Sequence, residues 1–399
     1  MNTFGHIFRL TTFGESHGPA IGGVIDGCPA GLHLDFSAIK RRVALRSPQN
    51  VVGATKRREP DNIEFLSGIY EGVTLGTPIA FIIRNKDVRS EDYADLEHIY
   101  RPGHADYTYD MRYGIRDYRG GGRASARTTV AQVVAGAIAE QWLAKKGISF
   151  TAFVDQIGPI LIPDVTDGND VDQSPLRCPD KFTEALWLDL LEQVRDEGDS
   201  IGGAVRCEIK GVPAGVGEPV FNKVQADLSS AMMSIPAAKG FEYGLGMSAA
   251  AAQGTESNDE ILSRDTACRV LTSEANNNRV MACRVLTSEA NNNRDTACRV
   301  RKGQNIEKST TPKVKFNTNR AGGLLGGITT GEPIYFRVAF KPVSSISQPQ
   351  RTVTDSGQAV ALQISGRHDV CVAPRAVAVV RAMAAITIMD QILLRNIES

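Results

Sequence analysis

The stretch "YRGGGRASARTTVAQVVAGAIAEQWLAKK", residues 118–146, joins a run of three glycines to the first strongly periodic segment of the chain. Its apolar residues recur at helical spacing, at Val130, Val133, Val134, Ile138 and Leu143. Intervals of three and four residues place side chains on one side of a helix. The pattern therefore predicts a helix from Thr128 to Lys146 that starts directly after the glycine run and its arginine.

Outward from this helix, the remaining segments alternate irregularly between strand and helix patterns. We expect buried strands at 22–27 and 77–83, helices at 183–196 and 226–235, a strand at 332–340 and a long final helix at about 376–395;. No regular β-α alternation and no linker interrupts this order. The sequence therefore predicts one α+β domain over residues 1–399.

Composition narrows the class of protein. The chain has 399 residues, of which 42% are hydrophobic and 23% charged, as in soluble globular proteins;. The 45 basic and 45 acidic side chains cancel, so no overall field attracts nucleic acid or an anionic membrane;. No signal-peptide pattern begins the chain, which makes a cytoplasmic location the expectation. Seven cysteines without a C-x-x-C pair indicate neither a zinc site nor a disulfide framework, and no metal is expected;.

One region differs from the rest of the chain because it contains a sequence repeat. "RDTACRVLTSEANNN" from Arg264 is followed by "RVMACRVLTSEANNN" from Arg279 and by a third, partial copy from Arg294. A period of 15 residues matches neither a heptad multiple nor a familiar solenoid unit. We interpret residues 261–314 as a polar insertion that carries this repeat, and a metal-binding cysteine array is the weaker alternative.

Two glycine-rich turns are candidates for chemistry. "FGESHG", residues 13–18, presents Ser16 and His17 from a tight turn, although the histidine could equally be structural;. The glycine run, residues 120–122, exposes backbone N–H groups at a helix start. It lies beside Arg123, Ser125 and Arg127, and the set suits a phosphate or carboxylate;. A flexible hinge with solvated arginines is the other interpretation.

Three further motifs add titratable and basic groups. They are "RPGHADYTY" (101–109) with His104, "SGRHDVCVAPRA" (365–376) with Arg367, His368 and Asp369, and "KPVSS" (341–345); Arg46 adds one more cation. Histidines can act as general acids near neutral pH. Together the motifs indicate a substrate with several anionic groups and proton transfer as the chemistry.

These motifs give the chain a close resemblance to the chorismate synthase family. The similarity extends from the N-terminus to the final helix, apart from about 261–314, and its most specific elements are "GESHG", "RPGHADYTY", "DYRGGGRASAR", "TNRAGGLLGGI" and "GRHDVC". The resemblance implies the family's sandwich of antiparallel sheets flanked by helices, and its homotetramer. It also implies conversion of 5-enolpyruvylshikimate 3-phosphate into chorismate and phosphate by a 1,4-anti elimination that requires reduced FMN.

The resemblance also implies a role for each matching residue. His17 would protonate or stabilise the leaving phosphate, His104 would hold a proton near the flavin, and Asp369 would help to remove the substrate proton. Contacts to FMN would come from Arg123, Ser125, Ala237, Gly326, Lys341, Pro342, Val343, Ser344, Ser345 and Arg367. Contacts to the substrate would come from Arg46, Arg127 and Ser16, and NADPH is a possible reductant.

Departures from the family pattern leave two alternatives open. Val52 stands at a position that is basic in the family, Ala124 replaces a serine, and Arg381 replaces a glutamate on the final helix. One alternative is a chorismate synthase that also reduces its own flavin, against which Val52 counts. The other is a phosphometabolite- or flavin-binding protein without activity, against which the joint presence of His17, His104 and Asp369 counts.

Overall fold

The structure is a computed structural model that describes residues 1–47, 61–86, 96–163, 171–263, 314–364 and 369–398. These residues belong to two compact units. The first unit consists of Met1–Ser257 and Arg320–Ser399, and the second of Asn258–Asn319. All of the candidate site residues lie in the first unit.

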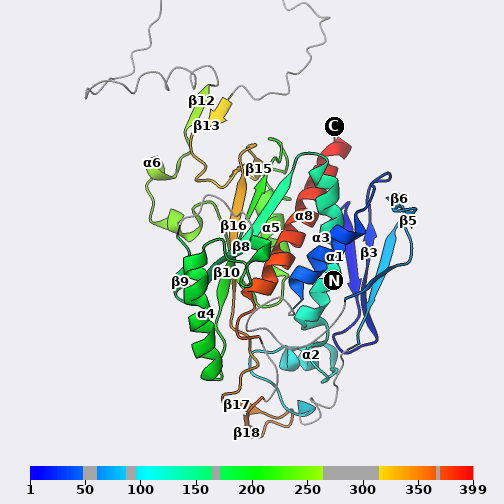
Figure 1. Ribbon diagram of the computed structural model, residues 1–399, viewed down its shortest axis with the longest axis vertical. Coiled ribbons are helices and arrows are strands. Elements are labelled where there is room, and N and C mark those ends of the chain that lie inside the picture. Colours follow the sequence, from blue (N-terminus) through cyan, green and yellow to red (C-terminus); the bar gives the residue numbers. More distant parts are fainter. Residues whose placement is uncertain (48–60, 87–95, 164–170, 264–313, 365–368, 399) are drawn as a thin grey trace, which may run out of the picture. The chain divides into compact units, whose positions relative to one another are not determined.

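The first unit contains two five-stranded antiparallel sheets (Figure 1). The first sheet has the order β1 (Thr3–Phe4), β2 (Arg9–Phe13), β3 (Ala20–Asp26), β7 (Ile79–Arg84) and β4 (Ile63–Phe65). The second has the order β11 (Ala238–Tyr243), β16 (Ile334–Phe340), β10 (Gly203–Lys210), β8 (Ser149–Ile157) and β9 (Ile160–Leu161). Strand residues alternate between buried and exposed positions, as a sheet with one covered face requires. In β7, for example, Ile79, Phe81 and Ile83 are fully buried.

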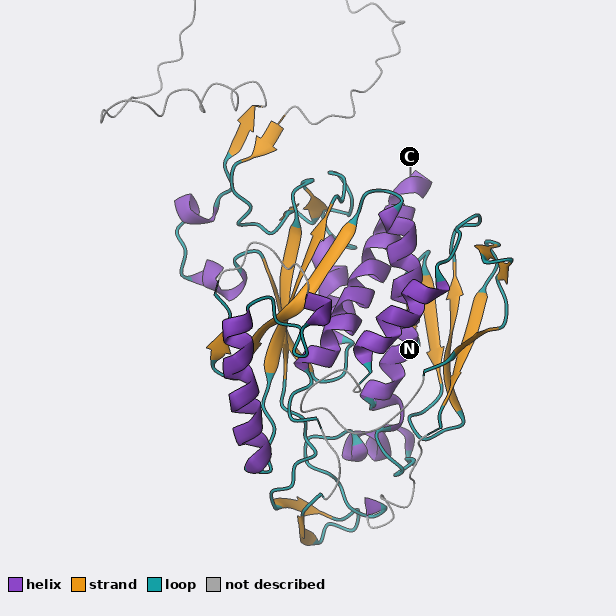
Figure 2. Cartoon of the chain, in the orientation of Figure 1, coloured by secondary structure: helices purple, strands orange, loops and turns teal. Residues whose placement is uncertain are grey.

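Four helices lie between the two sheets (Figures 1 and 2). They are α1 (Phe36–Arg46), α3 (Thr129–Ala144), α5 (Val224–Met233) and α8 (Ala373–Glu398). Helices α4 (Lys181–Asp196), α2 (Asp106–Tyr113) and α6 (Gly254–Ser257) lie outside this layer, and α4 packs against β9. The sequence of layers is thus sheet, helices, sheet, with the main hydrophobic core on both sides of the helices.

Short hairpins complete this unit. They are β5 (Ile69–Tyr70) with β6 (Val73–Thr74), β14 (Leu324–Leu325) with β15 (Ile328–Thr329), and β17 (Gln350–Val353) with β18 (Ala359–Leu362). In the second unit, β12 (Ile261–Ser263) pairs antiparallel with β13 (Val314–Phe316). The 15-residue repeat lies outside the described residues, so the polar insertion stays a prediction.

The centre of the helical layer is the contact between α3 and α8. A Cβ atom at Gly136 would lie 2.4 Å from both Cα and Cβ of Ala382, so glycine is what allows the two backbones to approach this closely. Helix α8 is long and apolar enough by composition to cross a membrane, and 83% of its most apolar window is buried inside the protein. This burial accounts for the composition, because a helix that is apolar all round suits a core position.

The α+β class is confirmed, and so are the elements that the periodicity predicted. The helices at 128–146, 183–196, 226–235 and 376–395 correspond to α3, α4, α5 and α8, and the strands at 22–27, 77–83 and 332–340 to β3, β7 and β16. Their boundaries differ by at most three residues, and the start of α3 also differs in conformation. Two short 3₁₀ turns, Gly122–Ala124 and Ala126–Thr128, separate the glycine run from α3, which starts at Thr129.

Candidate active site

The first part of the site is the contact between the His17 turn, residues 13–18, and the glycine run. Ser16 N donates to Gly122 O at 3.3 Å, and Ser16 Oγ lies 3.1 Å from His17 Nδ1. A Cβ atom at Gly120 would lie 2.3 Å from His17 Nδ1, and the φ of Gly120 is +96°. Only glycine satisfies both conditions. The glycine run therefore lets the backbone pass directly beside the imidazole.

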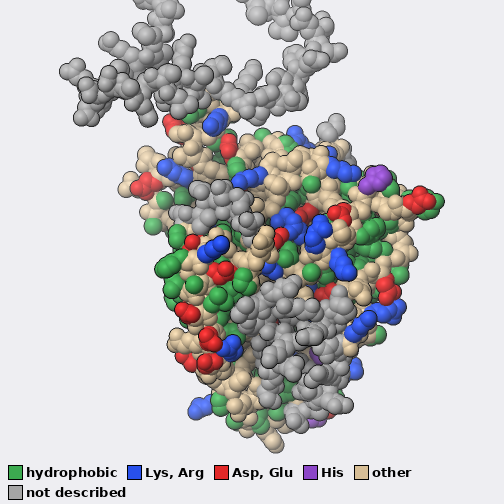
Figure 3. All heavy atoms as spheres, viewed as in Figure 1, with side chains coloured by type: hydrophobic (Ala, Val, Ile, Leu, Met, Phe, Trp, Pro, Cys, Tyr) green, Lys and Arg blue, Asp and Glu red, His purple; other side chains and the backbone are tan. Residues whose placement is uncertain are grey.

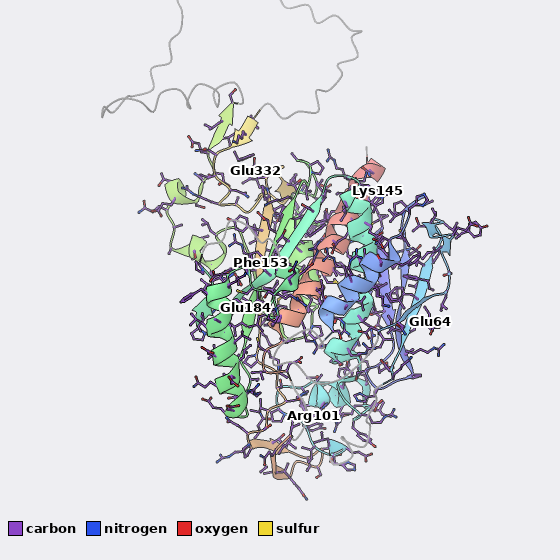
Figure 4. The ribbon with its side chains drawn as sticks, viewed as in Figure 1. Glu64, Arg101, Lys145, Phe153, Glu184 and Glu332 are labelled. Carbon is purple, nitrogen blue, oxygen red and sulfur yellow. The ribbon has the colours of Figure 1, made fainter. Side chains whose placement is uncertain are left out.

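Two arginines hold these turns in place. The Arg123 guanidinium donates to the carbonyl of Gly14 at 3.0 Å and to the carbonyl and hydroxyl oxygens of Thr12 at 3.2 and 2.6 Å. Arg101 is buried beside α2, where Figure 4 labels it, and its Nη2 donates to Gly120 O at 2.9 Å. Each side chain donates to at least one backbone carbonyl of these turns, and Arg101 is itself held by Asp106, so the position of the His17 turn is fixed.

A buried group of two arginines and one carboxylate forms the second part. Arg46 Nη2 donates to Asp61 Oδ2 at 2.8 Å, and Arg127 Nη1 donates to Asp61 Oδ1. All three residues are at most 6% exposed. Burial raises the pKa of the Asp61 carboxyl, but the two guanidiniums outweigh burial, and the pKa lies below its ordinary value. Burial lowers the pKa of Arg46 to about 10, although Asp61 opposes the shift.

The third part lies at the start of α8. Arg375 Nη1 donates to Asp369 Oδ2 at 2.5 Å, and Arg375 Nε donates to the backbone oxygen of Arg46 at 3.1 Å. A small pocket opens between the Arg46 and Arg375 side chains, with apolar walls that include Pro236 and Val372. The pocket places two cations beside apolar side chains, and Asp369 is connected to it through its ion pair with Arg375.

His104 is held by two contacts. Its Nδ1 lies 3.1 Å from Pro102 O and its Nε2 lies 3.0 Å from Ser345 Oγ. Because a carbonyl only accepts, Nδ1 carries the proton, and Nε2 accepts from the Ser345 hydroxyl. Burial, assisted by the charge of Arg101, lowers the pKa of His104 to about 4. The imidazole is therefore neutral near pH 7.

The segment 341–345 packs against the turn that carries His104. Lys341 Nζ donates to Gly103 O at 3.0 Å and to Ser344 Oγ, which in turn donates to Gly103 O at 3.0 Å. Lys341 N donates to the carbonyl of Ala237, a residue with a φ of +69°. Burial lowers the pKa of Lys341. Three segments far apart in the sequence thus meet at Lys341: Gly103 and Ser344 at its ammonium group, and Ala237 at its backbone N–H.

The structure brings most of the predicted site residues into these groups, but not all of them. Gly326 lies in the turn between β14 and β15, ahead of β16, whereas Lys341 follows the end of β16. A seven-residue strand spans about 20 Å, so the two residues lie at opposite ends of it;. Arg367, His368 and Val52 lie outside the described residues.

Sequence reasoning missed four residues that connect the site: Asp61, Asn85, Arg101 and Arg375. Two signals were available. Arg101 begins the motif of His104, and Arg375 lies six residues after Asp369 in the motif that contains both. Asp61 and Asn85 carry no comparable signal, because each is isolated among ordinary loop residues.

Arg381, which replaces a glutamate of the family pattern, has a partner in this chain. Its Nε donates to both carboxylate oxygens of Glu140 on α3 at 3.0 Å, and Arg42 lies 3.3 Å from the same carboxylate. Basic side chains gather over the middle of the face shown in Figure 3. The changed charge is therefore balanced locally. Among the described residues, no group of three histidine, cysteine or acidic side chains could hold a metal ion.

Comparison with known proteins gives consistent results. The family model described as chorismate synthase matches residues 8–393. The chain is 46% identical to the chorismate synthase of Porphyromonas gingivalis over 98% of this chain and 95% of the relative. It is 46% identical to the chorismate synthase of Christiangramia forsetii over 98% of this chain and 96% of the relative. It is 45% identical to the chorismate synthase of Nitratidesulfovibrio vulgaris (strain Miyazaki F) over 99% of this chain and 98% of the relative.

A solved crystal structure of a chorismate synthase also matches. It is 27% identical in sequence and superimposes with a TM-score of 0.68. The match covers 98% of this chain and 93% of that one. Sequence and fold therefore indicate the same family over nearly the whole length of the chain.

Proposed function

Because the chain belongs to the chorismate synthase family, we propose that the residues joined between the His17 turn and Asp369 form its active site. The enzyme is a lyase of the shikimate pathway that converts 5-enolpyruvylshikimate 3-phosphate into chorismate and inorganic phosphate. One observation carries the assignment of the site. An unbroken series of contacts leads from the His17 turn through Asn85, Arg127, Asp61, Arg46 and Arg375 to Asp369.

The charges of the site suit this substrate, which carries one phosphate and two carboxylates. Cations outnumber carboxylates: Arg46, Arg101, Arg123, Arg127, Arg375 and Lys341 stand against Asp61, Asp106 and Asp369. We assign the substrate anions to Arg46 and Arg127, with the Ser16 hydroxyl as a further donor. Guanidinium groups bind such anions through charge-assisted hydrogen bonds, which are stronger than neutral ones.

The elimination breaks a C–H bond at one end of the substrate's reacting carbons and the C–O bond to phosphate at the other. We propose that His17 donates a proton to the leaving phosphate, because the glycine run fixes its ring;. Asp369, held by Arg375, assists removal of the carbon-bound proton at the other end. His104 is neutral in the structure, and a nearby anion would raise its pKa and allow it to hold a second proton;.

The family is flavin-dependent, and the finer proposal is that reduced FMN binds here. The donors around Lys341 fit an anionic, hydrogen-bonding ligand, because two of the three N–H bonds of Lys341 are used, by Gly103 and Ser344;. Ala237, bonded to the backbone of Lys341, and Ser345, bonded to His104, would contact the cofactor, together with Pro342, Val343 and Ser344. When bound, reduced FMN supplies electron density to the reacting carbon system without net redox change.

Arg123 and Ser125 would contribute from the other side, although the described bonds of Arg123 go to β2, Gly14 and Asn2. Gly326 lies too far along β16 to join them within one chain. We propose a homotetramer in the cytoplasm, in which a second subunit could present Gly326. NADPH is the proposed reductant if the enzyme reduces its own flavin.

An anaerobic assay tests this proposal. Purified protein is mixed with chemically reduced FMN and 5-enolpyruvylshikimate 3-phosphate, and chorismate absorbance and phosphate release are followed together. We expect both products in equal amounts. Turnover with oxidised FMN and NADPH alone would favour the alternative, an enzyme that also reduces its own flavin. Absence of turnover, in protein that binds reduced FMN, would contradict the assignment of the site.

The His17→Ala variant tests the proton donor. Loss of a general acid lowers kcat by about 10²-fold, and we expect FMN affinity to be unchanged. His98→Ala is a suitable control, because His98 pairs with Asp355, is largely exposed and lies outside the groups that form the site. Equal kcat values for both variants would remove His17 from the mechanism.

A further inference from the structure

Asn85 connects two parts of the site through the two ends of one amide. Its Nδ2 donates to the carbonyl of Gly18 at 2.8 Å and to that of Glu15 at 3.1 Å. Its Oδ1 accepts from Arg127 Nε at 3.1 Å. The His17 turn and the substrate-binding arginine are thus joined through a single side chain.

The fold explains why this residue can make the connection. Asn85 follows directly after β7, and β7 pairs with β3, in which Ala20 is the partner of Arg84. The next residue along β7 therefore meets the chain just before β3, and Asn85 N donates to Pro19 O at 3.2 Å. The backbone of Asn85 is consequently held by the first sheet, and its side chain extends from a rigid base.

The chemistry of the contact requires an amide. Two carbonyl oxygens need donors, and Arg127 Nε needs an acceptor. Among side chains of this size only asparagine has both, because aspartate offers acceptors alone and leucine offers neither. The burial of Arg127, which is 6% exposed, makes the acceptor more important, because an unpaired donor in the interior is costly;.

We propose that Asn85 is a positioning residue, which sets the place of His17 relative to Arg127 and so aligns the proton donor with the bound substrate anion. This inference rests on the roles proposed above for His17 and Arg127. In this proposal Asn85 acts through the positions of the His17 turn and Arg127. Its effect is geometric, and a misplacement of about 1 Å can lower a rate by about 10²-fold.

Two substitutions of nearly equal size test the proposal. Asn85→Leu removes all three hydrogen bonds, and Asn85→Asp keeps an acceptor for Arg127 but loses both donors to the His17 turn. We expect kcat to fall about 10- to 100-fold in both variants, because both release the turn. We expect KM for the substrate to rise several-fold in Asn85→Leu, because Arg127 Nε loses the acceptor that Asn85 supplies. A kcat in Asn85→Asp equal to that of the unmodified protein would overturn the proposal.

Gln141→Leu is a matched control. The Gln141 amide also bridges backbone groups, accepting from Asp35 N at 2.8 Å and donating to Asp35 O at 3.1 Å, but it lies on α3 towards the end that Lys145 marks in Figure 4. Rates are expressed per folded protein, measured by circular dichroism at the assay temperature. Gln141→Leu should leave kcat and KM unchanged. If Asn85→Leu changes only the thermal midpoint, as a purely structural residue would, the proposal is wrong.

A double-mutant cycle separates this proposal from the one on which it rests. If Asn85 acts through His17, the His17→Ala substitution should lower kcat about 10²-fold in the unmodified chain and much less in Asn85→Leu. Independent effects that multiply would refute the coupling while leaving His17 as the proton donor. A normal kcat in His17→Ala itself would refute the assignment of His17 instead.

Discussion

Removal of the Asp61 charge should show how much the stability of the fold depends on the counter-ion that the two buried arginines share. In Asp61→Asn, the Arg46 and Arg127 guanidiniums stay buried but lose their shared counter-ion. Breaking a buried ion pair from one side costs about 3–5 kcal/mol. The amide oxygen retains one acceptor, so we expect the lower end of that range. At about 2 °C per kcal/mol for a large domain, the thermal midpoint should fall by about 6 °C.

The pH dependence of the same variant provides a second measurement. The pKa of Asp61 is lowered in the folded protein, so the ionised carboxylate stabilises the fold at every pH above the unfolded pKa of about 3.9;. This contribution disappears as pH falls through the folded pKa. The difference in midpoint between the unmodified protein and Asp61→Asn should therefore be constant from pH 7 to pH 5. Below about pH 4 it should shrink.

The assay is thermal unfolding followed by circular dichroism, with and without inorganic phosphate. Phosphate at 100 times its Kd stabilises a protein by about 2.7 kcal/mol, and in Asp61→Asn it can also take the place of the carboxylate. Asp26→Asn is the control, because the Asp26–Arg9 pair is 41–50% exposed and such pairs contribute about 1 kcal/mol or less;. Equal shifts in Asp61→Asn and Asp26→Asn would refute the reasoning.

Three further predictions follow from individual contacts. Gly136→Ala should lower stability by about 1–3 kcal/mol, because the new methyl group would meet Ala382, and urea unfolding measures the change;. His104 should remain neutral at pH 6 without ligand and titrate only near its pKa of about 4, which nitrogen chemical shifts of the ring would report. Arg381→Glu should destabilise the contact between α3 and α8, because two carboxylates would then face each other at Glu140, and Glu140→Lys in the same chain should restore the thermal midpoint.

The sequence predicted α3, α4, α5 and α8 from their apolar spacing, and it missed α1 and α2 for identifiable reasons. Helix α1 buries Ile39, Val43 and also Arg46, so a charged residue interrupts its apolar face. In α2, the residue with a buried side chain is Asp106, which leaves no apolar pattern to detect. The class of the fold was predictable, whereas a helix that is placed by ion pairs was not.

The sequence motifs identified many of the residues that lie in the candidate site. They did not identify which side chains form ion pairs or hydrogen bonds with one another. The Arg127–Asp61 contact joins residues 66 positions apart, and the contact from Arg375 to the backbone of Arg46 joins residues 329 apart. Such pairs arise from tertiary packing and leave no spacing in the sequence. This is why Asp61 and Asn85 could be found only in the structure, and why the motif of Arg375 did not reveal its partners.

The pairing changes how the arginines are interpreted. A count of positive charges treats Arg123 and Arg127 alike, because both follow the glycine run. In the structure, Arg123 donates to β2 and to the His17 turn, whereas Arg127 shares a carboxylate with Arg46. An arginine committed to backbone carbonyls contributes geometry, and one that shares an internal carboxylate can exchange that partner for a substrate anion. Discrimination between the two roles therefore depends on hydrogen-bond partners, because both side chains carry the same charge.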